Sequence, residues 1–142
     1  MTRLTLTTLT AALLLSACCA TKVPDEQERG ALSTHMVNLS SDVEGYFAEQ
    51  PGAPAESDAE ILKAATRRHP SDLAPEFERY TLKVQYQNPF AVVLLCTKDG
   101  KRAIMEDAGC SARLDRQVTN PAPCEFTLHV SNGCQVQGAD PR

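Results

Sequence analysis

The spacing of apolar residues changes once along this chain, from a helical repeat to strict alternation, and this change constrains the fold more than any other feature. Between residues 25 and 49 the apolar positions recur at steps of four and three, which places them on one face of a helix: Leu32, Met36, Leu39, Val43 and the pair Tyr46-Phe47. Pro24, with acidic residues behind it, indicates that the helix starts there. We expect this apolar stripe to lie in the core.

A second, shorter helix is predicted after the segment 51–54, where two prolines and a glycine end the first helix. Ser57 and Glu60 have the spacing of a capping box at its start. The helix is expected to end near Arg68, because the residue before Pro70 disfavours helical backbone.

Alternation begins at residue 80, where Tyr80, Leu82, Val84 and Tyr86 fall on one face of a predicted strand. After a turn at 88–89, the nearly continuous apolar run 90–97 indicates a central strand covered on both faces, or a strand whose outer face is shielded. An Asp-Gly hairpin signal at 99–100 predicts a strand returning through residues 102–106.

Residues 107–123 follow as a long irregular connection, and residues 124–130 form the predicted fourth strand, before a tight turn at Asn132-Gly133. The sequence therefore predicts an α+β fold: two N-terminal helices followed by a four-stranded antiparallel meander sheet stapled by two disulfides. The long helix is expected to lie across one face of the sheet.

Residues 1–17 have the layout of a secretory signal peptide. Arg3 supplies the positive start, residues 4–15 form an apolar stretch too short to span a bilayer, and Ser16-Ala17 are the small residues of a cleavage site.

The segment Leu15-Ser16-Ala17-Cys18 resembles the lipobox of bacterial lipoproteins, in which the cysteine becomes the lipidated first residue of the mature chain. The resemblance covers residues 1–18 and implies acyl chains on Cys18 that anchor the protein to a membrane. The alternative is an ordinary cleaved signal peptide followed by a coincidental cysteine.

The residue after Cys18 is Cys19, whereas many lipoproteins that stay in the inner membrane have an aspartate at this position. We therefore expect the protein to be anchored in the outer membrane and to face the periplasm. Residues 18–23 are then a lipidated tether, and residues 24–142 a single periplasmic domain.

Six cysteines in an exported chain indicate disulfide bonds. Apart from the pair at the predicted anchor, they all lie in the C-terminal third and are expected to form two bridges: Cys96, Cys110, Cys124 and Cys134. Cys19 is left over, and we interpret it as a tolerated thiol, with a free reactive thiol and pairing between molecules as alternatives.

The predicted hairpin also suggests which cysteines pair. A two-residue loop places Cys96 opposite Ala103, near the hairpin tip, whereas Cys110 lies beyond the far end of the returning strand, about 20 Å away. A bridge needs Cα atoms about 5.5 Å apart, so Cys96–Cys110 is disfavoured, and the same argument disfavours Cys124–Cys134. If residues 124–130 run back along the third strand, Cys124 meets Cys110 and Cys134 meets Cys96. We therefore predict these two nested bridges, with the other pairings as alternatives.

The composition narrows the classes of partner. The chain has a formal net charge of −4, and Arg3 is the only charged residue of the predicted signal peptide, so the mature domain is slightly more acidic. An acidic domain without a basic run is a poor candidate for binding nucleic acid or for docking directly on anionic lipid. We expect contact with the membrane through the lipid anchor only.

The sequence contains none of four common catalytic motifs: Gly-x-Ser-x-Gly of serine hydrolases, Cys-x-x-Cys, His-Glu-x-x-His of zinc proteases, and a glycine-rich phosphate-binding loop. His35, His69 and His129 fall on separate predicted elements, so we expect no metal site, and we expect no cofactor. Glu106 and Asp107 are adjacent carboxylates, but neighbouring strand residues point to opposite faces, and we interpret them as the charged end of a strand. The chain is therefore expected not to be an enzyme, with a hydrolase as a distant alternative.

These features favour a non-enzymatic outer-membrane lipoprotein whose periplasmic domain binds another cell-envelope protein in an assembly or scaffold role. Outer-membrane lipoproteins with helix-plus-sheet domains include envelope assembly factors, which the predicted architecture resembles at the level of the fold alone. The alternative is a periplasmic inhibitor or immunity protein against a toxin or a cell-wall-degrading enzyme, with the connection 107–123 inserted into a cleft. Deletion of residues 111–122 is then expected to spare folding and to abolish partner binding.

Overall fold

The computed structural model describes residues 23–141, so the predicted signal peptide, Cys18 and Cys19 lie outside the described residues. The chain forms helices α1 (Glu26–Glu49) and α2 (Asp58–Ala65), and then two short 3-10 helices, η1 (Pro70–Asp72) and η2 (Pro75–Arg79). The strands that follow are β1 (Tyr80–Gln87), β2 (Phe90–Thr97), β3 (Ala103–Asp107), β4 (Arg116–Gln117), β5 (His129–Ser131) and β6 (Gln135–Gln137). Neither α1 nor any other helix of residues 23–141 has the length and apolar character needed to cross a membrane.

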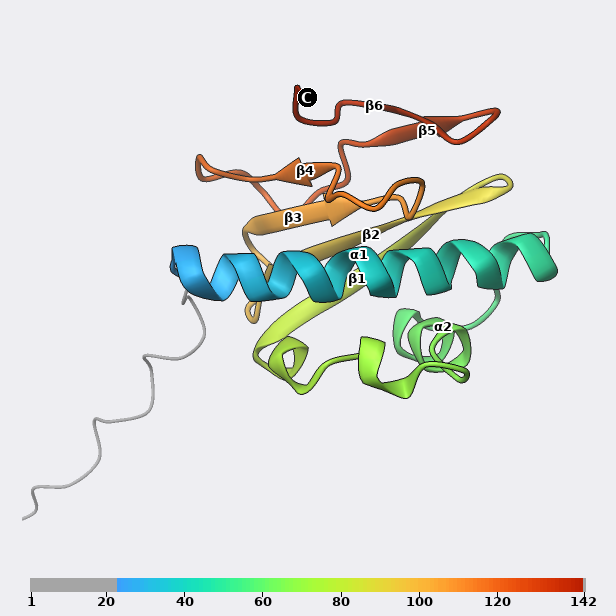
Figure 1. Ribbon diagram of the computed structural model, residues 1–142, viewed down its shortest axis with the longest axis horizontal. Coiled ribbons are helices and arrows are strands. Elements are labelled where there is room, and N and C mark those ends of the chain that lie inside the picture. The colour runs from blue at the N-terminus through green and yellow to red at the C-terminus, as the bar shows by residue number, and fades with distance from the viewer. Residues whose placement is uncertain (1–22, 142) are drawn as a thin grey trace, which may run out of the picture.

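Strands β1 to β4 form one antiparallel sheet in the order β1-β2-β3-β4, and β5 and β6 form a separate hairpin. Helix α1 runs across one face of the sheet, with α2 at the β1 side and the β5–β6 hairpin at the opposite side (Figure 1). The predicted α+β class, with a long helix and a four-stranded antiparallel meander, is confirmed.

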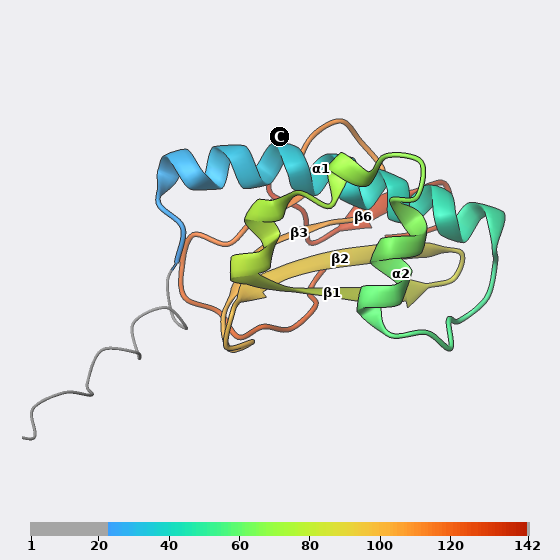
Figure 2. The same cartoon turned by 90° about the horizontal axis from the view of Figure 1, so that it is seen from below.

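Helix α1 begins at Glu26 and not at Pro24, because Asp25 is its N-cap. The Asp25 side chain accepts a hydrogen bond of 2.9 Å from the backbone N–H of Glu28. Helix α1 lies over the sheet (Figure 2). Five residues of the predicted stripe are at most 1% exposed: Leu32, Met36, Leu39, Val43 and Phe47. They share one core with side chains of β2 and β3. Tyr46, also part of the predicted stripe, is only partly buried against this core.

Helix α2 starts with a capping box in which the Ser57 side chain accepts from the backbone N–H of Glu60, and the Glu60 side chain accepts from the N–H of Ser57. Its buried residues Ile61 and Leu62 belong to the same core as α1. The side chains of Leu82, Val84 and Tyr86 on β1 pack against this core, as the alternation predicts.

Strand β2 is buried from Ala91 to Thr97, because the sheet is covered on both faces. Val93 and Leu95 face the helices, whereas Val92 and Leu94 belong to two smaller apolar clusters formed with the C-terminal segment. This third layer is irregular, and it is held to the sheet by side chains of β1. Lys83 donates to the carbonyl of Cys124 at 3.3 Å, and Gln87 donates to the carbonyl of Leu128 at 2.9 Å.

The position predicted for the fourth strand is wrong. The fourth strand of the sheet is Arg116–Gln117, inside the segment that the sequence indicates as irregular, and it pairs with Met105 and Glu106 of β3. Residues 124–128 belong to no strand, and only His129–Ser131 pair, with β6 across the Asn132-Gly133 turn.

The four distal cysteines form two disulfides, but not in the predicted pairing. The bridges are Cys96–Cys124, with Cα atoms 5.8 Å apart, and Cys110–Cys134, with Cα atoms 5.6 Å apart. Cys96 does lie opposite Ala103, so the register is correct at the hairpin tip, but a bulge between Leu95 and Cys96 shifts the rest of the pairing by one residue. The pairing fails because β4 already runs back along β3, which brings Cys124 to the hairpin tip. The chain then runs back across the face of the sheet opposite α1, and this brings Cys134 to Cys110.

Candidate functional site

Two adjacent carboxylates of β3 organise the region around the loop that follows this strand. The two residues do form the charged end of β3, but they are buried there: Glu106 is 0% exposed and Asp107 is 1% exposed. They do point to opposite faces of the sheet, Glu106 toward the C-terminal layer and Asp107 toward α1. Burial of both is possible because each carboxylate has hydrogen-bond donors on its own face.

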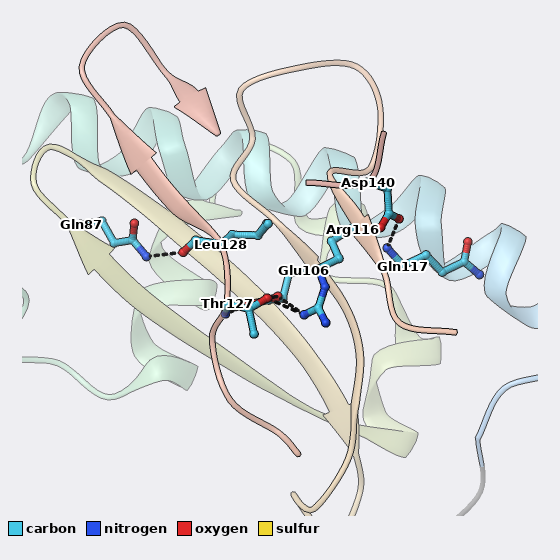
Figure 3. A network of polar contacts seen from close by, with 7 residues as sticks. All are labelled: Gln87, Glu106, Arg116, Gln117, Thr127, Leu128 and Asp140. Atoms are coloured by element: carbon cyan, nitrogen blue, oxygen red, sulfur yellow. Dashed lines mark hydrogen bonds and ion pairs between the residues drawn. The ribbon is translucent and has the colours of Figure 1, made fainter. Parts of the chain in front are cut away.

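Glu106 joins three segments on the C-terminal side of the sheet (Figure 3). Its Oε1 accepts from the backbone N–H of Thr127 at 2.7 Å, and its Oε2 accepts from the Thr127 hydroxyl at 2.6 Å and from Arg116 Nη1 at 2.7 Å. Arg116 therefore neutralises a fully buried carboxylate, while its own side chain is 22% exposed. This network fixes β4 and the segment 124–128 on β3.

Asp107 holds the loop 108–115 against α1. Its Oδ1 accepts from the backbone N–H of Asp115 at 2.8 Å, its Oδ2 accepts from the N–H of Gly109 at 3.1 Å, and the Ser40 hydroxyl contacts the same Oδ2. Asp115 in turn accepts from the N–H of Ala108 at 3.0 Å. Burial raises the pKa of Asp107 to about 6, and the hydrogen bond from Ser40 opposes this shift.

The raised pKa of Asp107 predicts a loss of stability as the pH rises. The folded protein holds the Asp107 proton more tightly than the unfolded chain, whose pKa is near the ordinary 3.8, so the free energy of unfolding falls between about pH 4 and pH 6. The contribution is up to about 3 kcal/mol for two pKa units. Denaturant unfolding at pH 4.5 and 7.5 should show this fall in the parent protein and not in Asp107→Asn. Other carboxylates titrate equally in both proteins, so an identical pH dependence in both would contradict the assignment.

A polar groove of about 460 Å³ lies between α1 and the loop braced by Asp107. Thr34 and Asn38 line it from exposed positions of α1, and Arg113 and Asp115 line it from the loop. Its third side is the C-terminal segment, where Asp140 accepts from the backbone N–H of Gln117 at 2.8 Å. Sequence reasoning missed this groove, because Thr34 and Asn38 lie on the polar face of the helix and carry no spacing signal of their own.

The loop is not a dispensable connection. Residues 111–122 include strand β4, the buried residues Asp115 and Val118, and Arg116, the charged partner of Glu106. Deleting this segment would leave a buried carboxylate without its partner, so the expectation that the deletion spares folding is wrong. Point substitutions on the exposed rim of the groove are the appropriate test instead.

The three histidines lie apart from one another, as the sequence indicates, but one of them meets carboxylates. His35 packs edge-on against the Phe77 ring at a centroid distance of 6.3 Å, and His129 is exposed on β5. His69 lies 2.9 Å from an Asp42 oxygen through its Nδ1, and Asp72 is close to both. The hydrogen bond and the charge of Asp42 raise the pKa of His69. No pattern in the sequence indicated this meeting of His69 with two carboxylates.

The structure brings Cys96, Cys110, Cys124 and Cys134 together in pairs, whereas Cys18, the predicted lipidation site, lies outside the described residues. Comparison of the chain with protein-family models, with curated proteins and with solved structures finds no match.

Proposed function

We propose that this chain is a lipoprotein of the outer membrane whose periplasmic domain binds another protein of the cell envelope without catalysing a reaction. The observation that carries the proposal is the lipobox-like segment ending at Cys18, followed closely by the folded domain, whose first helix begins at Glu26. Such a short tether would keep the domain near the membrane surface, where its partners are other envelope components. Two disulfides in the domain are consistent with an oxidising compartment such as the periplasm.

The groove between α1 and the loop 111–115 is the proposed contact surface for the partner. It combines exposed amide and hydroxyl groups of Asn38 and Thr34 with the exposed charge of Arg113, and it is held rigid by the hydrogen bonds of Asp107. Rigid presentation of polar groups lowers the entropy lost on binding and favours a specific protein contact.

An inhibitor or immunity protein is the second candidate, and one observation favours it. The loop 110–115 is braced at one end by the Cys110–Cys134 disulfide and at the other by the Asp107–Asp115 hydrogen bond, while Ala112 and Arg113 between them are exposed. A short loop fixed at both ends is suited to insertion into the cleft of an enzyme.

The partner can be identified by in vivo photo-crosslinking in the full-length protein. A crosslinker at the exposed groove position Asn38 is compared with one at the exposed position Lys63 on α2, each in the presence of Cys18 and in a Cys18→Ser variant. An outer-membrane or cell-wall assembly protein captured at Asn38 only, and lost in Cys18→Ser, is the expected result. A toxin or muralytic enzyme captured at Asn38 with and without Cys18 would favour the inhibitor instead.

Lipidation is tested in the same strains. The parent protein should carry acyl chains detectable by mass spectrometry and should sediment with the outer membrane, whereas Cys18→Ser should carry none and should be released in soluble form. Soluble parent protein without acyl chains would contradict the anchor. The absence of any specific crosslink at Asn38 would contradict the groove as a contact surface.

A further inference from the structure

A surface cluster of one imidazole and two carboxylates lies where η1 packs beside α1. Asp42 comes from α1, His69 precedes η1, and Asp72 is the last residue of η1. One ligand atom from each of the three lies within 4.8 Å of the others, and the Nδ1 of His69 is 2.9 Å from Oδ1 of Asp42. Such separations approach those of atoms bound to one metal ion, because bonds of about 2.0–2.2 Å place neighbouring ligands a little more than 3 Å apart.

The second oxygen of Asp42 provides an independent observation. Among the buried side-chain oxygen and nitrogen atoms of residues 23–141, Oδ2 of Asp42 is the one without a hydrogen-bond partner in the protein. Both carboxylates of β3, by contrast, receive donors from the protein on each of their oxygens. A buried carboxylate oxygen without a protein donor is costly unless a group from outside the chain compensates it.

We propose that Asp42, His69 and Asp72 bind a zinc ion. An imidazole nitrogen with two carboxylates matches the ligands of zinc, whereas calcium and magnesium prefer oxygen ligands alone. Three protein ligands leave one tetrahedral position for water, and the 62% exposure of the His69 side chain leaves that position open to solvent. The ion clamps the segment after α2 to α1. The groove between α1 and the loop 111–115 is lined by other residues of α1, so this site is independent of the proposed function.

The test is isothermal titration of zinc into the full-length protein in a Cys19→Ser background, which removes a competing thiol. The expected result is one zinc ion per chain, with a higher melting temperature when zinc is present, because the ion binds the folded state. Calcium and magnesium should produce neither effect. Absence of zinc binding to this parent protein would overturn the proposal.

Substitutions locate the site. His69→Gln and Asp72→Asn should each weaken zinc binding by at least about tenfold. His129→Gln, which removes an exposed histidine far from the cluster in sequence, is the matched control and should bind zinc as the parent does. Because His69 is exposed, His69→Gln should fold normally, which circular dichroism can verify, even where Asp42→Asn does not. Zinc binding of unchanged affinity in His69→Gln would place the ion elsewhere and overturn the proposal.

Discussion

The substitution Gly109→Ala is expected to lower the free energy of unfolding by about 2–5 kcal/mol, because two penalties act at one position. Gly109 has a φ of +70°, a left-handed conformation that costs an L-residue about 1–2 kcal/mol. A Cβ atom at this position would lie 2.4 Å from the carbonyl oxygen of Ser40 and 2.7 Å from its carbonyl carbon, both backbone atoms of α1. A helix backbone cannot move aside as a flexible side chain can, so the loop would have to separate from α1, at a further cost of about 1–3 kcal/mol.

Gly100 offers a matched control for the conformational part of this effect. Its φ is +68°, nearly the same as that of Gly109, but a Cβ atom there would meet nothing within 4 Å. Urea denaturation of the full-length protein should therefore show Gly100→Ala destabilised by only about 1–2 kcal/mol. Equal losses in the two variants would mean that the loop 108–115 does not depend on its close contact with α1.

The helix and the first three strands of the sheet were predictable because their signals are local. The 4-3 spacing that ends at Phe47 and the alternation from Tyr80 to Tyr86 each follow from which side chains must leave water. Strand β2 could be recognised as doubly covered because it carries no polar face between Ala91 and Cys96. These elements depend little on what the rest of the chain does.

The C-terminal third was not predictable in the same way. Strand β4 has two residues, Arg116 and Gln117, which are too few for any periodicity and are both polar. Its Arg116 pairs with the buried Glu106 on β3, an interaction that appears only when the sheet is assembled. The disulfide error follows directly, because one undetected strand reversed the direction in which Cys124 and Cys134 approach the sheet.

The candidate sites were hidden for a related reason. Asp42 and His69 are 27 positions apart, one on the outer part of a helix and one in the turn before η1, and no spacing rule connects them. The burial of Asp107 was hidden as well: a carboxylate at a strand end is usually solvated, and donors from Ser40 on α1 and from the loop that ends at Asp115 permit its burial. Burial of a charge depends on long-range donors, so sequence patterns underestimate it.

The substitution Arg116→Met is expected to cost about 3–5 kcal/mol of stability, because it leaves the buried Glu106 carboxylate without its charged partner. The Glu106 side chain is 0% exposed, so water cannot replace the guanidinium. Methionine retains the length of the apolar stem, which limits the effect to the loss of charge and hydrogen bonds. The measurement is the free energy of unfolding from denaturant titration at neutral pH. The control is Arg113→Met, at an exposed position of the preceding loop, which should alter the free energy of unfolding by no more than about 0.5 kcal/mol.

A double variant separates the ion pair from the packing of the same side chains. In Glu106→Gln/Arg116→Met, the neutral amide can still accept from the Thr127 N–H through its oxygen, and no uncompensated charge is buried. The double variant should therefore be more stable than Arg116→Met alone, since replacing both partners of a buried pair is tolerated better than removing one. The alternative outcome is that the loss of unfolding free energy in the double variant equals the sum of the losses in Glu106→Gln and Arg116→Met. In that case the two residues act independently, and the Arg116 charge is not what permits Glu106 to be buried.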